Sequence, residues 1–281
     1  MRMALRCRLY TPRTARVASP AHVKEIDTVL QHIARTIERG GRLTVLTGAG
    51  VSAESGIPTF RDAGGLWENH SLEEVATPEG FRRNPDLVYR FYNARRRALA
   101  SVEPNAAHVA LARTEAALGE RFRLITQNID DLHERGGSRR VLHMHGEVLK
   151  ARCIRCGGVL RWTEDLDATH VCPNCHGPLR PHIVWFGEMP FYMEEEIPDA
   201  LGAEVFVSIG TSGTVYPAAG FFAEAQSRGA VTVEINIEPS ANAAHFDLVL
   251  AGRATEQVRR LAGAIGASGL DSPAPPEKPR S

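Results

Sequence analysis

Two Cys-x2-Cys pairs, fifteen residues apart, constrain the fold of this chain more than any other feature of its sequence. They are Cys153 with Cys156, and Cys172 with Cys175. In a zinc ribbon of this spacing each pair supplies two thiolates, and the two pairs complete a tetrahedron around one ion. Because four protein ligands leave no open position, the spacing predicts a structural zinc and not a catalytic one.

The zinc module is expected to span about residues 150–182. Zinc binding can contribute ~10–16 kcal/mol to the folding of a module that lacks a core of its own. His170 and His176 are rival ligands, but a full set of cysteines makes them unnecessary. A ribbon can also bind nucleic acid. This segment has no strong basic run, and the chain balances 33 Lys plus Arg against 33 Asp plus Glu, so no nucleic-acid partner is expected.

The 281 residues have room for one substantial domain with a smaller insertion. No apolar run reaches the roughly 18 residues of a membrane-spanning helix, so no membrane partner is expected. The chain lacks the apolar segment of a secretory signal, and a cytoplasmic location is the favoured prediction. The Arg-rich, acid-poor residues 1–24 also fit a transit peptide, which keeps a mitochondrial location open. A monomer is expected.

Five short apolar runs predict the strands of a sheet, and segments of helical periodicity such as 105–119 and 217–229 lie between them. Apolar strands that alternate with helices are typical of an α/β fold whose parallel sheet has helices on both faces. Ligands of such sheets bind beyond the carboxyl ends of the strands. The runs are LTVLT (43–47), RLITQ (123–127), EVFVSIG (204–210), VTVEINI (231–237) and DLVLAG (247–252).

A single catalytic domain with a Rossmann-like core is therefore predicted over residues 25–267. The mostly helical segment 62–104 and the zinc module interrupt the alternation and are expected to form a second, smaller lobe. Residues 1–24 are predicted to be a disordered basic arm. Residues 268–281, which are rich in Pro and Ser, are predicted to be a disordered tail.

The first predicted strand is followed by a G-x-G-x-x-A turn that runs from Gly48 to Ala53. Glycines at its first two positions let a backbone approach a pyrophosphate, and the next helix would face the phosphates with its free N–H groups. A plain tight turn is the alternative. The acidic residue that usually ends the second strand of a dehydrogenase is not evident, which disfavours a hydride-transferring enzyme.

Polar residues follow two later strands. The run Thr126 to Asp130 supplies two amides and a carboxylate that could orient a ligand, although Asn and Asp are also common in caps and turns. His143 and His145 alternate along the chain and are expected on one face of a strand. A His is more often packed than catalytic. His145, followed by Gly146 at the rim of the sheet, is the better candidate for a base.

Joined in order, these motifs resemble the sirtuins, the NAD-dependent protein lysine deacylases. The resemblance covers residues 42–263 and implies NAD as co-substrate and acylated proteins or peptides as partners. The matching stretches are Thr47 to Ser52, Gly56 to Arg61, Thr126 to Asp130, His145 with Gly146, the four cysteines, Val184 to Glu188, Gly210 to Ser212 and Asn236 to Glu238.

The resemblance implies which residues would contact NAD. The turn and the loop after it would hold the pyrophosphate and cover the nicotinamide ribose, the end of the 123–127 strand would line the nicotinamide pocket, and later strand ends would contact the adenosine. The first group is Gly48, Ala49, Gly50, Ser52, Ala53, Phe60, Arg61 and Trp67, the second is Gln127, Asn128, Ile129 and Asp130, and the third is Gly210, Thr211, Ser212, Asn236, Ile237, Glu238 and Ala254.

The resemblance also implies the catalytic and substrate residues. The acyl oxygen would attack the ribose carbon as nicotinamide leaves, and His145 would then accept the proton of a ribose hydroxyl. Asn128 and Asp130 are assigned to the catalytic group with it. The substrate backbone would pair as an added strand with the segment that contains Val184, Phe186, Gly187 and Glu188.

A predicted helix over residues 86–100 indicates which acyl group is removed. Its apolar stripe includes Tyr92 and Arg95, one turn apart, and an Arg on such a stripe either extends to water or meets an anion. Hydrogen bonds to a carboxylate contribute ~1.5–3 kcal/mol each, enough to select acidic acyl chains. With the small Ala76 opening the pocket, this pair resembles the desuccinylase branch of the sirtuins, whose bacterial members also accept acetyl-lysine. Snorkelling on a basic helix remains the alternative.

Three functions are compatible with these motifs. The favoured one is a deacylase that acts on succinyl-lysine and acetyl-lysine. A protein mono-ADP-ribosyltransferase would share the NAD site without needing an acyl channel, and a non-enzymatic regulator would need no catalytic residues. Tyr92 with Arg95 disfavours the transferase, and the intact His145, Asn128 and Asp130 disfavour the regulator.

Overall fold

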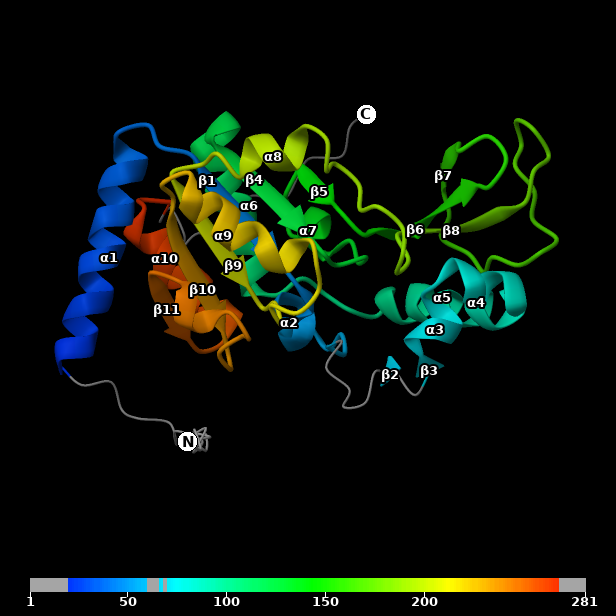
Figure 1. Ribbon diagram of the computed structural model, residues 1–281, viewed down its shortest axis with the longest axis horizontal. Helices are drawn as coiled ribbons and strands as arrows, with labels where there is room; N and C mark the ends of the chain where they lie inside the picture. The colour runs from blue at the N-terminus through cyan, green and yellow to red at the C-terminus, as the bar shows by residue number, and fades with distance from the viewer. Residues whose placement is uncertain (1–19, 60–65, 68–69, 268–281) are drawn as a thin grey trace, which may run out of the picture.

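A parallel sheet of six strands forms the larger lobe. The computed structural model describes residues 20–59, 66–67 and 70–267. The strand order is β11-β10-β9-β1-β4-β5, and all neighbours pair in parallel (Figure 1). The strands are β1 (Leu43–Thr47), β4 (Phe122–Thr126), β5 (Val141–His143), β9 (Val205–Ile209), β10 (Val231–Asn236) and β11 (Leu248–Ala251). The predicted fold class is confirmed.

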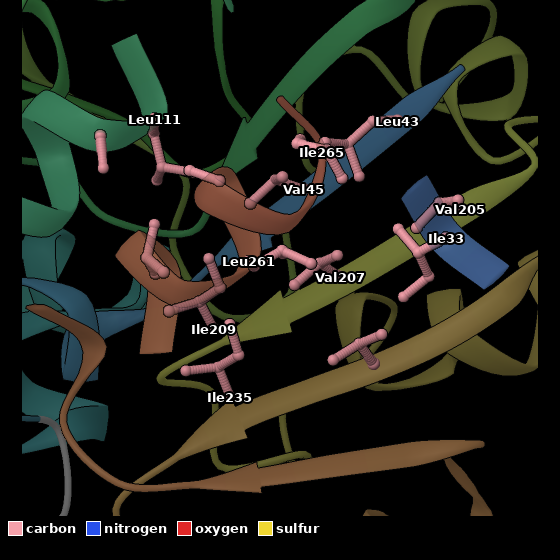
Figure 2. Packing of buried hydrophobic residues seen from close by; sticks show 14 of the residues in the cluster. Ile33, Leu43, Val45, Leu111, Val205, Val207, Ile209, Ile235, Leu261 and Ile265 are labelled. Carbon is pink, nitrogen blue, oxygen red and sulfur yellow. The ribbon is translucent and has the colours of Figure 1, made fainter. Parts of the chain in front are cut away.

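Helices cover both faces of the sheet because successive strand residues point to opposite sides. Val45 of β1 and Val207 of β9 pack against α1, α6 and α10 on one face, where Figure 2 shows Leu111 and Leu261 beside them. Leu46 and Phe206 pack against α8 and α9 on the other face. The helices are α1 (Pro20–Glu38), α6 (Ala106–Leu118), α8 (Glu196–Ala200), α9 (Phe221–Ser227) and α10 (Ala254–Ala264).

The smaller lobe combines the two predicted insertions (Figure 1). The first contains β2 (Leu66–Trp67), β3 (His70–Ser71), α3 (Leu72–Val75), α4 (Pro78–Arg83) and α5 (Pro85–Leu99). The second is an antiparallel sheet of order β7-β6-β8, with β6 (Gly146–Cys153), β7 (Val159–Arg161) and β8 (Leu179–Ile183). Tyr92 of α5 and Ile183 of β8 share one buried cluster, so the two insertions pack as one unit.

The remaining helical segments are short. They are α2 (Ala49–Ser52), α7 (Leu132–Arg135) and the 3-10 turns η1 (Ala53–Ser55), η2 (Gly119–Arg121), η3 (Ala218–Gly220) and η4 (Ala243–His245). Among the described residues no helix has the length and apolarity needed to cross a membrane.

The boundary of the predicted N-terminal arm differs from the structure. Helix α1 begins at Pro20, five residues before the domain was expected to begin, so residues 20–24, which were predicted to belong to the disordered arm, are helical. A proline fits the first turn of a helix, because its missing N–H would have no partner there. Residues 1–19 of the arm and the predicted tail 268–281 lie outside the described residues.

Candidate active site

A cavity of about 1510 Å³ lies at the carboxyl ends of the central strands, where residues of both lobes line it. The glycine turn after β1, the turn after β4 and the loops after β9 and β10 contribute from the larger lobe. Helix α5 and the segment after β8 contribute from the smaller one. This is the edge at which the sequence predicted a ligand.

The glycine turn is shaped by close contact with a second glycine. Gly50 N–H donates to the Gly210 carbonyl at 2.9 Å, and a Cβ on Gly50 would lie 2.6 Å from the Gly210 Cα atom. Gly210 itself has a φ of +62°, a conformation that favours glycine. Gly50 lies within α2, which has only four residues. The glycines therefore allow two backbone segments to meet beside the cavity, in addition to any approach of a ligand.

Ser52 connects the glycine turn to the residues after β4. Its hydroxyl donates to Asp130 Oδ2 at 3.1 Å and accepts from Asn128 Nδ2 at 3.1 Å. Asp130 Oδ1 also accepts from Leu132 N–H at 3.1 Å. Burial raises the pKa of the Asp130 carboxyl, although these hydrogen bonds act in the opposite direction. Asn128 and Asp130 line the cavity, whereas Ser52 is fully buried behind it.

His145 lines the cavity in the tautomer that a base requires. Its Nδ1 lies 3.1 Å from the Gln127 carbonyl. A carbonyl can only accept, so Nδ1 carries the proton and the lone pair of the neutral ring is on Nε2. Burial lowers the pKa of His145, which keeps the ring neutral below the ordinary range of histidine. Asn128, Asp130 and His145 are thus brought to one cavity, as predicted.

His143 is placed differently from its neighbour in the sequence. Strand β5 ends at His143 and β6 begins at Gly146, so the expected common strand face is interrupted between the two histidines. The His143 ring is buried, at 4% exposed, and it contacts the Glu134 carboxylate and the backbone carbonyl of Asn128. Only His145 of the pair lines the cavity among the described residues. The preference for His145 over His143 agrees with this geometry.

The residues predicted for the adenosine side also line the cavity. Asn236 Nδ2 donates to the Thr211 carbonyl at 2.7 Å, which connects the ends of β9 and β10. The lining set comprises Gly210, Thr211, Ser212, Asn236, Ile237, Glu238 and Ala254, together with Gly48, Ala49, Gly50, Ala53, Gln127 and Ile129. Phe60 and Arg61 lie outside the described residues, and of Trp67 only its place in β2 is described.

Tyr92 and Arg95 lie one turn apart on α5 and face the same cavity as Ala76. Tyr92 is fully buried, and burial raises the pKa of its hydroxyl, so the hydroxyl keeps its proton. Its oxygen accepts from Trp185 Nε1 at 3.1 Å. The Arg95 guanidinium carbon lies 3.2 Å from the centre of the Phe91 ring, and NH1 donates to the Phe91 carbonyl. The arrangement offers a hydroxyl and a guanidinium to one ligand group.

The segment after β8 borders the cavity but its side chains differ in role. Phe186 N–H donates to the Ala76 carbonyl at 2.9 Å, and Phe186 is 46% exposed. The Glu188 carboxylate accepts from Arg180 at 2.6 Å and from Arg152 at 3.2 Å. These bonds hold the pKa of Glu188 below its usual value even though burial acts to raise it. Glu188 therefore fixes the segment, which also contains Val184 and Gly187, within the protein.

Trp185 is the residue of this segment that the sequence analysis did not assign to the site. It is 2% exposed, it holds the Tyr92 hydroxyl, and the Arg180 guanidinium carbon lies 3.3 Å from the centre of its ring. In the sequence, the only indication that Trp185 belongs to the site was its position within the matched stretch from Val184 to Glu188. Ile57, Val102, Met189 and Tyr216 also line the cavity and were not predicted.

The four cysteines of the ribbon converge as the spacing predicted. Their sulfurs all lie within 4.8 Å of one another, with Cys153 and Cys175 Sγ at 3.4 Å and Cys156 and Cys172 Sγ at 3.8 Å. Sulfurs bound to zinc at ~2.3 Å in a tetrahedron are separated by about 3.8 Å. The cluster could therefore hold one structural zinc, and it lies in the ribbon, apart from the residues that line the cavity.

This fold and this site define a Rossmann-like protein in which the carboxyl ends of the central strands face a second lobe that contains a four-cysteine ribbon. A family model described as the Sir2 family matches residues 48–217. This chain therefore belongs to the Sir2 family, and the resemblance to the sirtuins is confirmed.

Curated relatives and solved structures agree with the family. A protein of Escherichia coli K12 named NAD-dependent protein deacylase is 61% identical over 203 residues, 71% of this chain and 73% of the relative. A Salmonella typhimurium protein of the same name is 57% identical over 221 residues, 77% of this chain and 81% of the relative.

Two solved structures have a fold similar to that of this chain. The structure of a Sir2 homologue with NAD has a TM-score of 0.76 at 37% identity and covers 85% of this chain and 93% of that one. A Sir2 structure with a p53 peptide and NAD has a TM-score of 0.68 at 31% identity and covers 81% of this chain and 94% of that one.

Proposed function

We propose that this chain removes acyl groups from protein lysines by transferring them to the ADP-ribose part of NAD. The products are nicotinamide, O-acyl-ADP-ribose and free lysine. The proposal rests on one observation: His145 lines a cavity that also contains the glycine turn and the Tyr92–Arg95 pair. The names of the bacterial relatives and the NAD and peptide ligands of the solved structures support it.

Different residues of the chain bind NAD, transfer the proton and bind the peptide. The glycine turn and the ends of β4, β9 and β10 bind NAD, with Asn128 and Asp130 beside the nicotinamide. The acyl oxygen bonds to the ribose carbon as nicotinamide departs, and His145 Nε2 accepts the proton of a ribose hydroxyl. The oxygen of that hydroxyl then bonds to the acyl carbon, one water adds at the same carbon, and the lysine amine leaves. The segment around Phe186, half-exposed at the rim, pairs with the backbone of the acylated peptide.

The acyl group is best explained as a short acidic chain, with acetyl also accepted. Tyr92 can donate its hydroxyl proton, and the Arg95 guanidinium supplies positive charge from the next turn of the same helix. A succinyl carboxylate between Tyr92 and Arg95 would accept a hydrogen bond from the hydroxyl and would pair with the positive charge of the guanidinium. Acetyl-lysine fills the same channel without making these bonds.

Replacement of Arg95 by Met tests the acyl assignment. Loss of a charged hydrogen bond costs ~1.5–3 kcal/mol, so kcat/KM for a succinyl-lysine peptide should fall about 10- to 150-fold, with a small change for the acetyl-lysine peptide. Arg90→Met, at an exposed position of the same helix, is the control and should leave both activities unchanged. Equal losses on the two peptides for Arg95→Met would show that Arg95 does not bind the acyl carboxylate.

Mass spectrometry of an acylated peptide incubated with NAD distinguishes the proposed function from its rivals. A deacylase removes the acyl group from the peptide. A protein mono-ADP-ribosyltransferase instead adds ADP-ribose to a protein, and a non-enzymatic regulator changes neither. Acetyl-, succinyl- and glutaryl-lysine peptides assayed side by side also rank the acyl groups.

A further inference from the structure

We propose that His143 is a positioning residue of the NAD site, whose doubly protonated ring holds the turn at Asn128 in place from behind the cavity. The inference rests on the proposed function only in assigning Asn128 to NAD binding. The charge of the ring follows from contacts within the chain, so it can be tested without any activity.

The ring of His143 lies between two hydrogen-bond acceptors. Its Nδ1 is 3.1 Å from the Asn128 carbonyl oxygen, and its Nε2 is 2.8 Å from Glu134 Oε1. Neither a carbonyl nor a carboxylate can donate, so each nitrogen must supply a proton for both contacts to be hydrogen bonds. A neutral imidazole has only one N–H. The geometry therefore requires an imidazolium paired with Glu134.

The charges that face His143 favour this state. Glu134 of α7, Glu147 of β6 and Asp130 after β4 are acidic, and His133 of α7 is the basic neighbour. Burial acts to lower the pKa of His143, but the hydrogen bond to Glu134 and the charges of Glu134 and Glu147 raise it above its usual value. Burial lowers the pKa of His133 far below its usual value, so His133 stays neutral and adds no competing charge.

His143 acts on the site through the backbone. His145 Nδ1 binds the Gln127 carbonyl, and His143 Nδ1 binds the carbonyl of the next residue, Asn128. The Asn128 side chain in turn donates to Ser52 of the glycine turn. When His143 loses its charge, it gives up one proton, and a buried lone pair then faces one of its two acceptors. The negative charge of Glu134 favours the tautomer that keeps its proton on Nε2, so the lone pair on Nδ1 faces the Asn128 carbonyl and the turn is no longer held on this side.

The two histidines thus impose opposite requirements on pH. His145 must be neutral to accept a proton, and its pKa is lowered by burial. His143 must be charged to hold the turn, so its contribution is complete at low pH and is lost as the pH rises through its raised pKa. NAD affinity should accordingly decrease at alkaline pH through His143.

Two amide substitutions separate the two hydrogen bonds of the ring. In His143→Asn the amide nitrogen lies near the position of Nδ1 and can still donate to the Asn128 carbonyl without titrating. In His143→Gln the amide reaches toward Glu134 and leaves the carbonyl without its donor. By calorimetry at neutral pH, NAD should bind His143→Gln about tenfold more weakly than the parent, while His143→Asn stays within about threefold.

The pH dependence distinguishes positioning from a merely structural role. The decrease of NAD affinity at alkaline pH should disappear in His143→Asn and move to lower pH in Glu134→Gln, which retains the histidine. A structural role would lower the thermal midpoint of both His143 variants and leave the pH dependence of NAD affinity unchanged. NAD affinities that are equal in the parent and both variants at every pH would overturn the proposal.

Heteronuclear NMR of the ring nitrogens tests the charge itself. The His143 signals, assigned by their disappearance in His143→Asn, should show both nitrogens protonated at neutral pH. A neutral ring there overturns the proposal, whatever the activity. A charged ring with normal NAD binding in a protein that removes no acyl group would refute the proposed deacylase function and leave the role of His143 intact.

Discussion

At the scale of single residues, burial decides the chemistry of His145. Because burial lowers its pKa, the neutral form persists as the pH falls through the ordinary value of about 6.5. We expect the acidic decline of kcat/KM on an acyl-lysine peptide to lie below that value, and His145→Ala to lower kcat by ~10²–10⁴-fold. A pH–rate profile measures both. Full turnover by His145→Ala would refute its role as base, and an acidic decline centred above pH about 6.5 would contradict the lowered pKa.

Trp185 should contribute to the choice of acyl group. A buried tryptophan N–H needs an acceptor, and here the acceptor is the Tyr92 oxygen, which directs the hydroxyl proton away from Trp185. Trp185→Phe keeps the ring that stacks on Arg180 but removes the N–H. We expect the ratio of succinyl to acetyl activity to fall about two- to tenfold.

Trp162→Phe is the matched control for that experiment. Trp162 Nε1 donates to the Asp165 carbonyl at 3.3 Å in the zinc ribbon, so the same atom is removed at a site that does not line the cavity. The control should leave the ratio unchanged. If Trp185→Phe also left it unchanged, the Tyr92 hydroxyl would not depend on the indole for its orientation.

These residues also show which contacts of the site can be predicted from the sequence. The one-turn spacing of Tyr92 and Arg95 is local, so a helical pattern was enough to predict that they lie on one side of the helix, and both line the cavity. The bond from Trp185 to Tyr92 joins residues 93 positions apart, and no spacing rule predicts such a contact. The sequence analysis placed His143 and His145 on one face of a strand. It did not predict that strand β5 ends at His143, so the separation of the two histidines was missed.

At the scale of elements, the ribbon should depend on zinc while the main sheet does not. The fully buried Cys172 and the nearly buried Cys153 form a small cluster with Leu166 and Leu179, which is too small to replace ~10–16 kcal/mol of metal binding. Chelation, or Cys172→Ala, should therefore remove the hydrogen-exchange protection of β6 and β8. Strands β1 and β9, whose residues are all buried, should keep theirs.

Loss of the ribbon should also reduce deacylation. Ile183 of β8 packs in the same cluster as Tyr92, so disorder of β8 reaches the acyl end of the cavity. Added zinc should restore both protection and activity after chelation. Protection of β6 that survives metal removal would show that the ribbon folds without its ion.

The elements were predicted well wherever their signals are local. The five apolar runs are confirmed as strands β1, β4, β9, β10 and β11, and the helical segment 62–104 contains α3, α4 and α5. Strand β5 has only three residues and gave no run of its own. The basic composition suggested a disordered arm up to residue 24, whereas helix α1 begins at Pro20.

At the scale of the whole molecule, buried neutral histidines should limit stability in acid. Burial lowers the pKa of His108 to about 4 and that of His133 far below its usual value. Unfolding restores ordinary values, so the unfolded chain binds more protons below pH about 6.5 and the folded state loses stability as the pH falls. His108 alone accounts for about 2 kcal/mol at pH 5 relative to neutral pH.

Other groups act in the opposite direction, so the contribution of His108 must be isolated by difference. The raised pKa values of His143 and Asp130 stabilise the folded state as the pH falls, because the folded state then binds the additional proton. We expect the free energy of unfolding of His108→Gln, from urea titrations, to decline less between neutral pH and pH 5 than that of the parent. His32→Gln, exposed on α1, should follow the parent. Parallel curves for all three proteins would show that His108 titrates normally in the folded state. The ring of His108, which lies beside the Ser52 hydroxyl, would then have to be hydrated.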